Sequence, residues 1–424
     1  MPDDLPDVFL ERLQTQLQNV PNQLSPQVAA QMVRDTATLL EPETVFLSKA
    51  YGRVLAADVA SLVDQPARDN SALDGYACRL EDTRDASQET PVPLELIGDV
   101  PAGSVFNGRL KAGQAVSIYT GAAVPEGANA IIGIEHTRLE GSTVFLYQPA
   151  QPDAIRPKAQ DLQKGVAFLK QGTPLTPAAV GLAASMGHDR LPVVRRPKVG
   201  LLVTGNEVIA PGQALAPGQL YDANRYSLMG LLQQAGAEVE ILQTARDTLT
   251  DLQTRLANVD VDLILTSGGV SMGKYDFVRD VVFEDGEVIF WKIAMRPGGP
   301  ALFGRYRGIP LFGLPGNPVS CMVVFALIVK PFLLACLGSN QPMPLDNTVK
   351  AIAESDFAGA GFKVAFRRAH VRESYQDEHI KRFASSTGAQ GSNILTSMLA
   401  ADGLVVVPAY QNVSAGDEVD VVVL

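Results

Sequence analysis

The chain has 424 residues, of which 46% are hydrophobic and 19% are charged, and its formal net charge is −11 at pH 7. A chain of this length exceeds what a single hydrophobic core supports, so we expect a globular protein of about three or four domains. The acidic balance argues against nucleic acid as the main partner, and any bound anion must therefore be held by local basic residues.

Residue usage also bears on the compartment and on metal chemistry. The three cysteines are far apart and form no CxxC pair, which is typical of reduced thiols in a cytoplasmic protein. The four histidines lack metal-ligand spacing, so a zinc site is not expected. Residues 1–7 lack the basic start and apolar core of a signal peptide. The longest apolar run, 322–329, is followed by Lys330-Pro331 and predicts a buried helix rather than a membrane span.

Two predicted helices flank a β-rich stretch in the first half of the chain. Ser25 and Thr176 each precede a proline, an arrangement that caps and starts a helix. Between them, short apolar runs alternate with turn residues and indicate strands. We expect an inserted β-rich domain (residues 45–152) within a discontinuous helical linking domain (residues 1–44 and 153–194), whose two helices could pack together.

Strands and helices alternate from Arg195 onward. Strands are predicted at 198–203, 238–242, 263–265, 288–291 and 311–312, and helices at 225–234, 249–258, 277–282 and 319–337. This order predicts a three-layer α/β domain (residues 195–338) with right-handed crossovers. Residues 345–424 contain strand-like segments and predict a small β domain or barrel. The expected fold class is α/β plus β, in several domains.

The stretch from Leu263 to Asp276 has the pattern of a phosphate-binding loop. A short apolar strand ends in Thr266-Ser267-Gly268-Gly269, whose glycines allow φ > 0 and can turn backbone N–H groups toward one anion, with the Ser271 hydroxyl beside them. A plain turn is the alternative, because paired glycines are common where a chain reverses. Asp276 follows closely enough to hold a metal ion against the same anion.

Carboxylates follow three successive strands of this domain, at Glu207, Asp247 and Asp276. The carboxyl ends of parallel strands lie at one edge of a sheet, so these groups should converge. Opposed carboxylates repel one another unless a cation lies between them, which favours a hard divalent ion such as Mg²⁺. A solvated loop carboxylate is the alternative for Glu207 taken alone.

Two further segments could hold an anion. Lys292 and Arg296 are four residues apart before a Pro-Gly turn, where two cations could bind phosphate; solvated charges flanking a turn are the alternative. The segment Pro315-Gly316-Asn317-Pro318 opens a helix with Ser320 in its first turn, and helix N-termini favour anions.

Six segments, in this order, resemble the molybdopterin molybdenumtransferase family, known as MoeA in bacteria and as the E domain of gephyrin in animals. They are DNSALDGYA (69–77), TGAAVPEGANAII (120–132), TGNEV (204–208), TSGGVSMGKYD (266–276), MRPGGPALFG (295–304) and GLPGNPVS (313–320). The first two, taken alone, predict only structural turns. The resemblance runs from about residue 25 to the C-terminus, and the family's four-part architecture matches the domains expected above.

The resemblance implies a transferase of molybdenum cofactor biosynthesis, which inserts molybdate into adenylylated molybdopterin with Mg²⁺-dependent release of AMP. It implies a cytoplasmic homodimer whose active site lies between the α/β domain of one subunit and the β-rich insert of the other. Molybdopterin, AMP and molybdate are the implied ligands, and molybdoenzymes or an adenylyltransferase are candidate partners. Neither nucleic acid nor a membrane is expected.

The resemblance also assigns roles to residues by position. Asp74 and Thr120 would face the site from the partner subunit, whereas Glu207, Asp247 and Asp276 would hold Mg²⁺ or the pyrophosphate bridge. Lys292 and Arg296 match basic positions of the family and would be catalytic with them. Gly268, Gly269 and Ser271 would line the nucleotide-phosphate loop, and Pro315 and Pro318 would shape the pocket. Arg368 and Ser392 match a molybdate-contacting pair, and the further cofactor-binding positions are Thr204, Gly205, Ser267 and Ser320.

Three positions depart from the family pattern. Asn206 replaces the aspartate of a TGDE loop, Lys274 stands where an acidic residue is common, and Gly299 replaces the lysine of a PGKP turn, expected near molybdate. Lys274 could supply the lost charge. The departures leave open a catalytically weakened or scaffolding paralogue that binds molybdopterin. Molybdopterin adenylyltransferase is a further alternative, because a related α/β domain performs that preceding step.

Overall fold

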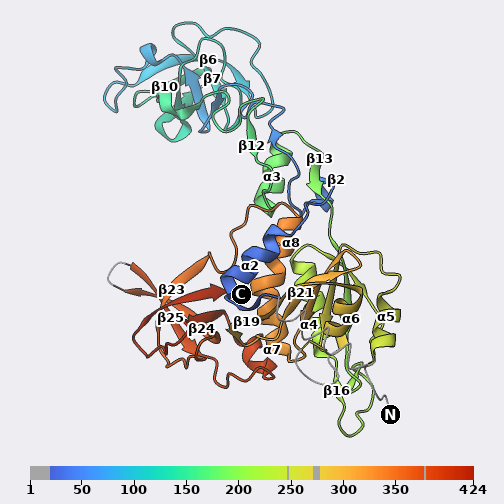
Figure 1. Cartoon of the computed structure of the whole chain (residues 1–424). Coiled ribbons are helices and arrows are strands. Elements are labelled where there is room, and N and C mark those ends of the chain that lie inside the picture. The colour runs from blue at the N-terminus through green and yellow to red at the C-terminus, as the bar shows by residue number, and fades with distance from the viewer. Residues whose placement is uncertain (1–19, 246–247, 271–276, 377–378) are drawn as a thin grey trace.

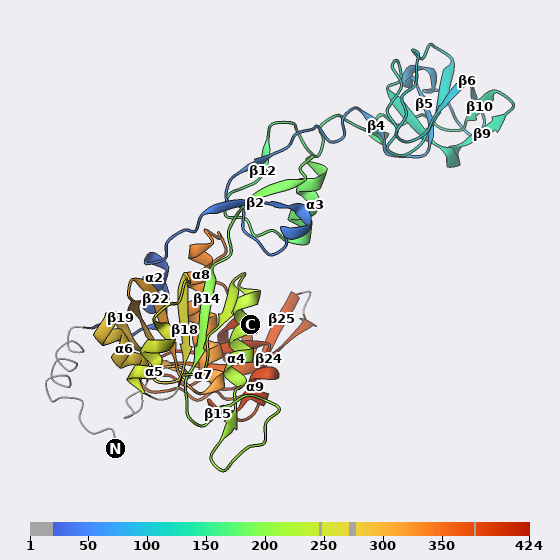
Figure 2. The ribbon, with the colours of Figure 1, turned by 90° about the vertical axis from the view of Figure 1, so that its right-hand side faces the viewer.

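The structure is a computed structural model that describes residues 20–245, 248–270, 277–376 and 379–424. The molecule is elongated (Figures 1 and 2). The β-rich domain lies at one end and a small linking domain lies in the middle; the α/β domain and the C-terminal β domain lie together at the other end. The predicted fold class, α/β plus β in several domains, is confirmed.

A seven-stranded sheet forms the centre of the α/β domain, in the order β1-β19-β21-β22-β18-β14-β17. Four neighbouring strands are parallel: β22 (Ile309–Leu314), β18 (Leu263–Ser267), β14 (Lys198–Val203) and β17 (Glu238–Ile241). The remaining strands are β21 (Leu302–Tyr306), β19 (Gly286–Ile293) and β1 (Asn22–Leu24). The sequence did not predict β1, because three residues carry no periodicity.

Helices cover both faces of this sheet and give the three predicted layers. One face packs against α2 (Pro26–Asp35), α4 (Ala223–Gln234), α7 (Pro318–Val324) and α8 (Lys330–Cys336), and the other against α5 (Leu249–Leu256) and α6 (Phe277–Asp285). Along β18, Leu263 and Leu265 join the first core and Ile264 joins the second. This alternation explains why a short apolar run marks a strand that is buried on both faces.

The apolar helix after β22 is a core helix, as predicted. α7, a π-helical turn at Phe325–Val329 and α8 follow one another from Pro318 to Cys336. The π turn lies directly ahead of Lys330-Pro331, where the proline has no N–H to donate within an α-helix. Within the described residues, this segment is the one helix long and apolar enough to cross a membrane, but 72% of its most apolar window is buried inside the protein.

The prediction that the two early helices pack together is wrong. α3 (Pro177–Ser185) packs with the antiparallel pair β2 (Pro42–Phe46) and β13 (Arg190–Val194) in the linking domain. α2 instead packs against α8 and the large sheet through Ala29, Ala30 and Val33. Both predicted helix starts are present, with Ser25 and Thr176 as N-caps. A sequence shows which side of a helix is apolar, but not which apolar surface that side will meet.

The β-rich domain contains a six-stranded sheet in the order β8-β5-β7-β6-β10-β9. Its strands are β5 (Gly75–Cys78), β6 (Val92–Val100), β7 (Gln114–Ile118), β8 (Ala130–Gly133), β9 (Thr137–Glu140) and β10 (Thr143–Leu146). Two short antiparallel pairs lie near this domain: β3 (Val59–Ala60) with β12 (Ala167–Leu169), and β4 (Asn70–Ser71) with β11 (Ile155–Arg156). A third short pair, which is parallel, follows β14 in the α/β domain and joins β15 (Val208–Ile209) to β16 (Leu220–Tyr221).

The C-terminal domain is a closed barrel. It consists of β23 (Thr348–Ala353), β24 (Val364–Gln376), β25 (His379–Ser386), β26 (Gly403–Val407) and β27 (Glu418–Val423), with the short helix α9 (Leu395–Leu399). The barrel closes because β24 pairs with both β25 and β26. β20 (Met295–Arg296) belongs to the α/β domain yet pairs with the start of β24, so backbone hydrogen bonds join the two domains.

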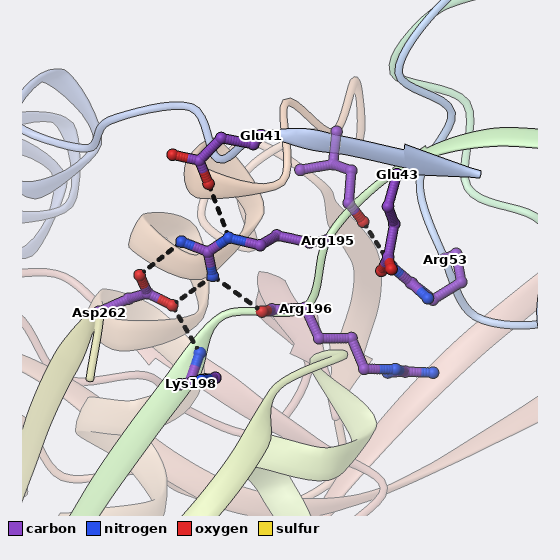
Figure 3. A network of polar contacts seen from close by, with 8 residues as sticks. Glu41, Glu43, Arg53, Arg195, Arg196, Lys198 and Asp262 are labelled. Atoms are coloured by element: carbon purple, nitrogen blue, oxygen red, sulfur yellow. Dashed lines mark hydrogen bonds and ion pairs between the residues drawn. The ribbon is translucent and has the colours of Figure 1, made fainter. Parts of the chain in front are cut away.

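An ion-pair network holds together the two chain segments that connect the linking domain to the α/β domain (Figure 3). Arg195 donates from Nε to Glu41 (2.7 Å) and from Nη1 and Nη2 to the two carboxylate oxygens of Asp262 (2.6 and 2.7 Å). The Lys198 N–H also donates to Asp262, at 2.8 Å. Asp262 directly precedes β18, so the network ties the linking domain to the sheet that carries the candidate site.

We expect the contribution of Asp262 to stability to be lost in acid. Burial alone would raise the pKa of Asp262, but hydrogen bonds from Arg195 and Lys198 outweigh it and hold that pKa below its ordinary value. A carboxyl with a lower pKa in the folded state stabilises the protein above about pH 4, and this stabilisation is lost as the pH falls through the folded-state pKa. Asp262→Asn should therefore lower the free energy of unfolding by about 1–2 kcal/mol at neutral pH, and by progressively less in acid.

Denaturant titrations at neutral pH and near pH 3 test this expectation. Asp189→Asn is the matched control, because the Asp189 side chain is 85% exposed in the same linking region and should change little at either pH. An equal loss of stability for Asp262→Asn at both pH values would contradict the assigned role.

Candidate functional site

Three parallel strands end side by side, and the loops that follow them form the floor of the candidate site. In the register of the sheet, Val203 of β14 pairs with Ser267 of β18, and Ser267 pairs with Leu314 of β22. The loops are tied together directly, since the Thr204 N–H donates to the Ser267 carbonyl (3.0 Å) and the Gly268 N–H donates to the Leu314 carbonyl (2.9 Å). The convergence predicted for Glu207, Asp247 and Asp276 stays a prediction, because Asp247 and Asp276 lie outside the described residues.

Glycine is required at the turn after β18. Gly268 has φ +95° and Gly269 has φ +69°, in the left-handed region that strains other residues. A Cβ at Gly268 would lie 2.7 Å from the Thr204 hydroxyl and 3.0 Å from its carbonyl. The Gly268 N–H is already used within the protein, so it is not one of the donors that this loop can turn toward an anion.

The Ser267 hydroxyl has a structural role. It is buried, accepts a hydrogen bond from Asn224 Nδ2 (2.8 Å) and lies 3.3 Å from the Cys321 sulfur. Asn224 also donates to the Gly316 carbonyl (2.7 Å), and the Cys321 thiol donates to the Pro315 carbonyl (2.6 Å). Burial raises the pKa of Cys321 to about 12, so this thiol stays protonated and fixes the loop instead of acting as a ligand.

Of the three carboxylates predicted to hold Mg²⁺, only Glu207 lies within the described residues. It is exposed on the loop after β14, and its Oε1 lies close to Gly205, where an added Cβ would be 2.9 Å away. Asp247 and Asp276, like Ser271 and Lys274, lie outside the described residues. Across the described part of the chain, no group of three or more His, Cys, Asp or Glu side chains could hold a metal ion.

A cavity of about 380 Å³ lies against the loop after β22, where the α/β domain meets the barrel. Its lining includes four residues predicted from the sequence and others that were not: Arg296, Pro315, Ser320, Ser392, Asn317, Lys363, Arg367 and Gln390. Three lining residues are cationic and, among the described residues, no Asp or Glu lines the cavity. An excess of uncompensated positive charge in a concave site favours a small anion. A larger cavity, of about 720 Å³ between α4, α8 and the barrel, is lined mostly by apolar side chains.

Arg367 lines this cavity, whereas Arg368, the residue predicted from the sequence, does not. Arg367 donates from Nε to Ala358 (2.8 Å) and from Nη2 to Gly359 (3.0 Å), and burial together with the charge of Arg296 lowers its pKa. Arg368 is fully buried on the opposite face of β24, because successive side chains of a strand alternate.

Arg368 holds the wall of the cavity in place instead. Its guanidinium donates to the Ala389 and Gly391 carbonyls (3.2 and 3.0 Å) and to Ser397 Oγ (2.6 Å), and its backbone pairs with the Gln390 side chain. Residues 390–392 line the cavity, so Arg368 positions them. A run of basic residues within a strand of an acidic chain was the available signal, but it could not tell Arg367 from Arg368.

Lys292 and Arg296 belong to different parts of the site. Arg296 lines the cavity. Lys292, with φ +69°, places its ammonium 4.1 Å from the centre of the Trp291 ring, and the indole N–H of Trp291 donates to the Val270 carbonyl (3.1 Å) in the glycine loop. Pro318 is the first residue of α7, where the Val319 N–H donates to the Ser392 carbonyl (3.1 Å).

Asp74 and Thr120 are brought together, but far from the cavity. Asp74 Oδ1 accepts from both the N–H and the hydroxyl of Thr120, each at 2.7 Å, and these bonds lower the pKa of Asp74. Both side chains are exposed at the end of the β-rich domain's strands β5 and β7. The linking domain separates the β-rich domain from the α/β domain within one chain (Figure 2).

Comparisons with known proteins cover nearly the whole chain. Three family models match in order: "MoeA N-terminal region (domain I and II)" at residues 24–187, "Probable molybdopterin binding domain" at 200–335 and "MoeA C-terminal region (domain IV)" at 350–424. The chain is 38% identical to Molybdopterin molybdenumtransferase 2 of Mycobacterium tuberculosis, over 93% of this chain and 97% of that protein. It is 35% identical to the Molybdopterin molybdenumtransferase of Haemophilus influenzae, with the same coverage.

A solved structure agrees with the sequence matches. The molybdopterin biosynthesis moeA protein of Pyrococcus horikoshii OT3 superposes with a TM-score of 0.79 at 29% identity, over 95% of this chain and 100% of that one. The match includes the β-rich, linking, α/β and barrel parts together, so the whole architecture is shared and not only the α/β domain. The chain therefore belongs to the MoeA family of molybdopterin molybdenumtransferases.

Proposed function

We propose that the protein inserts molybdate into adenylylated molybdopterin, with Mg²⁺-dependent release of AMP. The observation that carries the proposal is the cavity lined by Arg296, Lys363 and Arg367, which lies against the loop at the end of β22. That loop follows Leu314, whose carbonyl accepts from the Gly268 N–H at the end of β18. Among the described residues, the lining of this cavity has cations and no carboxylate, which suits a tetrahedral dianion such as molybdate. Loops at the carboxyl ends of the strands are where α/β sheets bind phosphorylated ligands.

Magnesium would be held by Glu207 together with Asp247 and Asp276. Of these three residues, the structure describes Glu207, an exposed carboxylate on a strand-end loop. Carboxylate oxygens are the ligands that Mg²⁺ prefers. When bound, the ion would neutralise charge on the pyrophosphate that joins molybdopterin to AMP. The protein's own cations would meanwhile bind and orient molybdate beside the dithiolene.

The working unit in this proposal is a homodimer with a shared site. Asp74 and Thr120 form a hydrogen-bonded pair in the β-rich domain, which the linking domain separates from the strand-end loops of the same chain (Figure 2). A partner subunit placed in the opposite direction would bring this pair to the strand-end loops, and two-fold symmetry would make two identical sites.

The assay is direct. Purified protein with Mg²⁺, molybdate and adenylylated molybdopterin should release AMP and yield cofactor that activates a molybdoenzyme lacking it. Binding of adenylylated molybdopterin without release of AMP would favour the scaffolding alternative that Asn206 and Gly299 leave open. Production of adenylylated molybdopterin from ATP would instead identify an adenylyltransferase.

A further inference from the structure

Lys363 reaches the part of the cavity that Gly299 leaves open. A Cβ built on Gly299 would lie 3.6 Å from Lys363 Nζ, an ordinary contact distance, so this ammonium lies next to the place where a side chain of residue 299 would begin. Lys363 directly precedes β24, whose first two residues pair with Met295 and Arg296 of β20. The pairing of the two domains thus fixes the backbone of Lys363 beside the turn that contains Gly299.

Lys363 and Arg296 are the cations of this cavity that are free to bind a ligand. Arg367 donates two of its guanidinium N–H groups to the carbonyls of Ala358 and Gly359. Within the described part of the chain, neither the Lys363 nor the Arg296 side chain forms a hydrogen bond or an ion pair; Lys363 has only a distant contact, 5.4 Å, with the ring of Phe362. A half-buried ammonium with three unused donors is suited to an oxyanion.

We infer that Lys363 determines the affinity for the oxyanion in this chain, binding it from the Gly299 side of the cavity together with Arg296. This inference rests on the proposed function and adds to it a residue that binds molybdate. Lys363 acts on molybdate alone, so its loss should leave the binding of the nucleotide-linked pterin unchanged.

The test measures molybdate dependence in Lys363 variants. Lys363→Ala should raise the half-saturating molybdate concentration about tenfold, the size expected for one charge-assisted contact, and leave that for adenylylated molybdopterin within about twofold. Lys363→Arg should stay within about threefold of the parent protein, because it keeps the charge. Titration calorimetry with molybdate alone should show the same order of affinities without any turnover.

A relocated lysine gives the sharpest control. Gly299 does not have a left-handed backbone, so Gly299→Lys is sterically accessible, although its Cβ would approach the Met295 carbonyl to 3.1 Å. The double variant Gly299→Lys/Lys363→Ala should recover most of the molybdate affinity that Lys363→Ala loses. Lys350→Ala, an exposed lysine of the same barrel paired with Glu418 and Asp420, should have no effect on molybdate.

Molybdate dependence and AMP release, measured on the same proteins, distinguish failure of the Lys363 role from failure of the proposed enzyme activity. If the parent protein releases AMP but Lys363→Ala has unchanged molybdate dependence, the inference fails and the function stands. If the parent protein binds molybdate in a Lys363-dependent way but releases no AMP, the function fails and the inference stands. The inference is also overturned if Lys363→Ala binds adenylylated molybdopterin more weakly than the parent protein does. It is overturned as well if the parent protein binds no molybdate in either measurement.

Discussion

Mixing an Asp74→Ala variant with a Glu207→Ala variant is expected to restore activity that neither has alone. In the proposed homodimer, each variant removes one half of the shared site, so each variant alone should lose about 100-fold or more in turnover. In a mixed dimer, one site carries both substitutions and the other carries neither. With random exchange of subunits, half of the dimers are mixed and half of their sites are intact, so activity should return to about a quarter of the parent value.

The control uses two substitutions from the same side of the proposed interface. Asp74 and Thr120 are hydrogen-bonded to each other in one β-rich domain, so Asp74→Ala mixed with Thr120→Ala should remain inactive. Mass spectrometry with one isotope-labelled variant shows whether mixed dimers form. If they form and the Asp74 and Glu207 variants still do not complement each other, the site is not shared between subunits.

Gly268→Ala is expected to damage the site through its backbone. The substitution combines left-handed φ strain with a contact of 2.7 Å to the Thr204 hydroxyl, which belongs to the neighbouring strand-end loop. The strain should cost about 1–2 kcal/mol of stability, and the steric contact should add about 1–3 kcal/mol. Relieving that contact would shift the loop by a fraction of an ångström or more, and misplacement of about 1 Å can cost about 100-fold in rate.

Gly212→Ala separates the two causes. Gly212 has φ +94°, almost the value of Gly268, but a Cβ there would meet nothing within 4 Å. It should therefore show the strain alone, with a small loss in melting temperature and near-normal release of AMP. Equal losses of activity in the two variants would show that the close approach to Thr204 does not matter.

The sequence alone determined those parts of the protein that depend on local pattern. Apolar runs marked β14, β18 and β22 because strands buried on both faces of a parallel sheet have no polar side. Ser25-Pro26 and Thr176-Pro177 marked two helix starts because a cap acts only on its own first turn. The polar loops at three strand ends could be expected to meet because parallel strands end at one edge.

Only the tertiary structure decided which distant groups share a surface. The sequence suggested that α2 could pack with α3, whereas α2 packs into the larger core of the α/β domain and α3 into that of the linking domain. It suggested Arg368 for the cavity, but the orientation of β24 in the barrel turned Arg367 toward it and buried Arg368 behind its wall. The pairing of β20 with β24 brought Lys363 to Gly299 across more than 60 residues of chain. Local patterns encode which backbone forms and which side is apolar, but contacts between domains depend on how complete surfaces fit, and no short stretch of sequence records that fit.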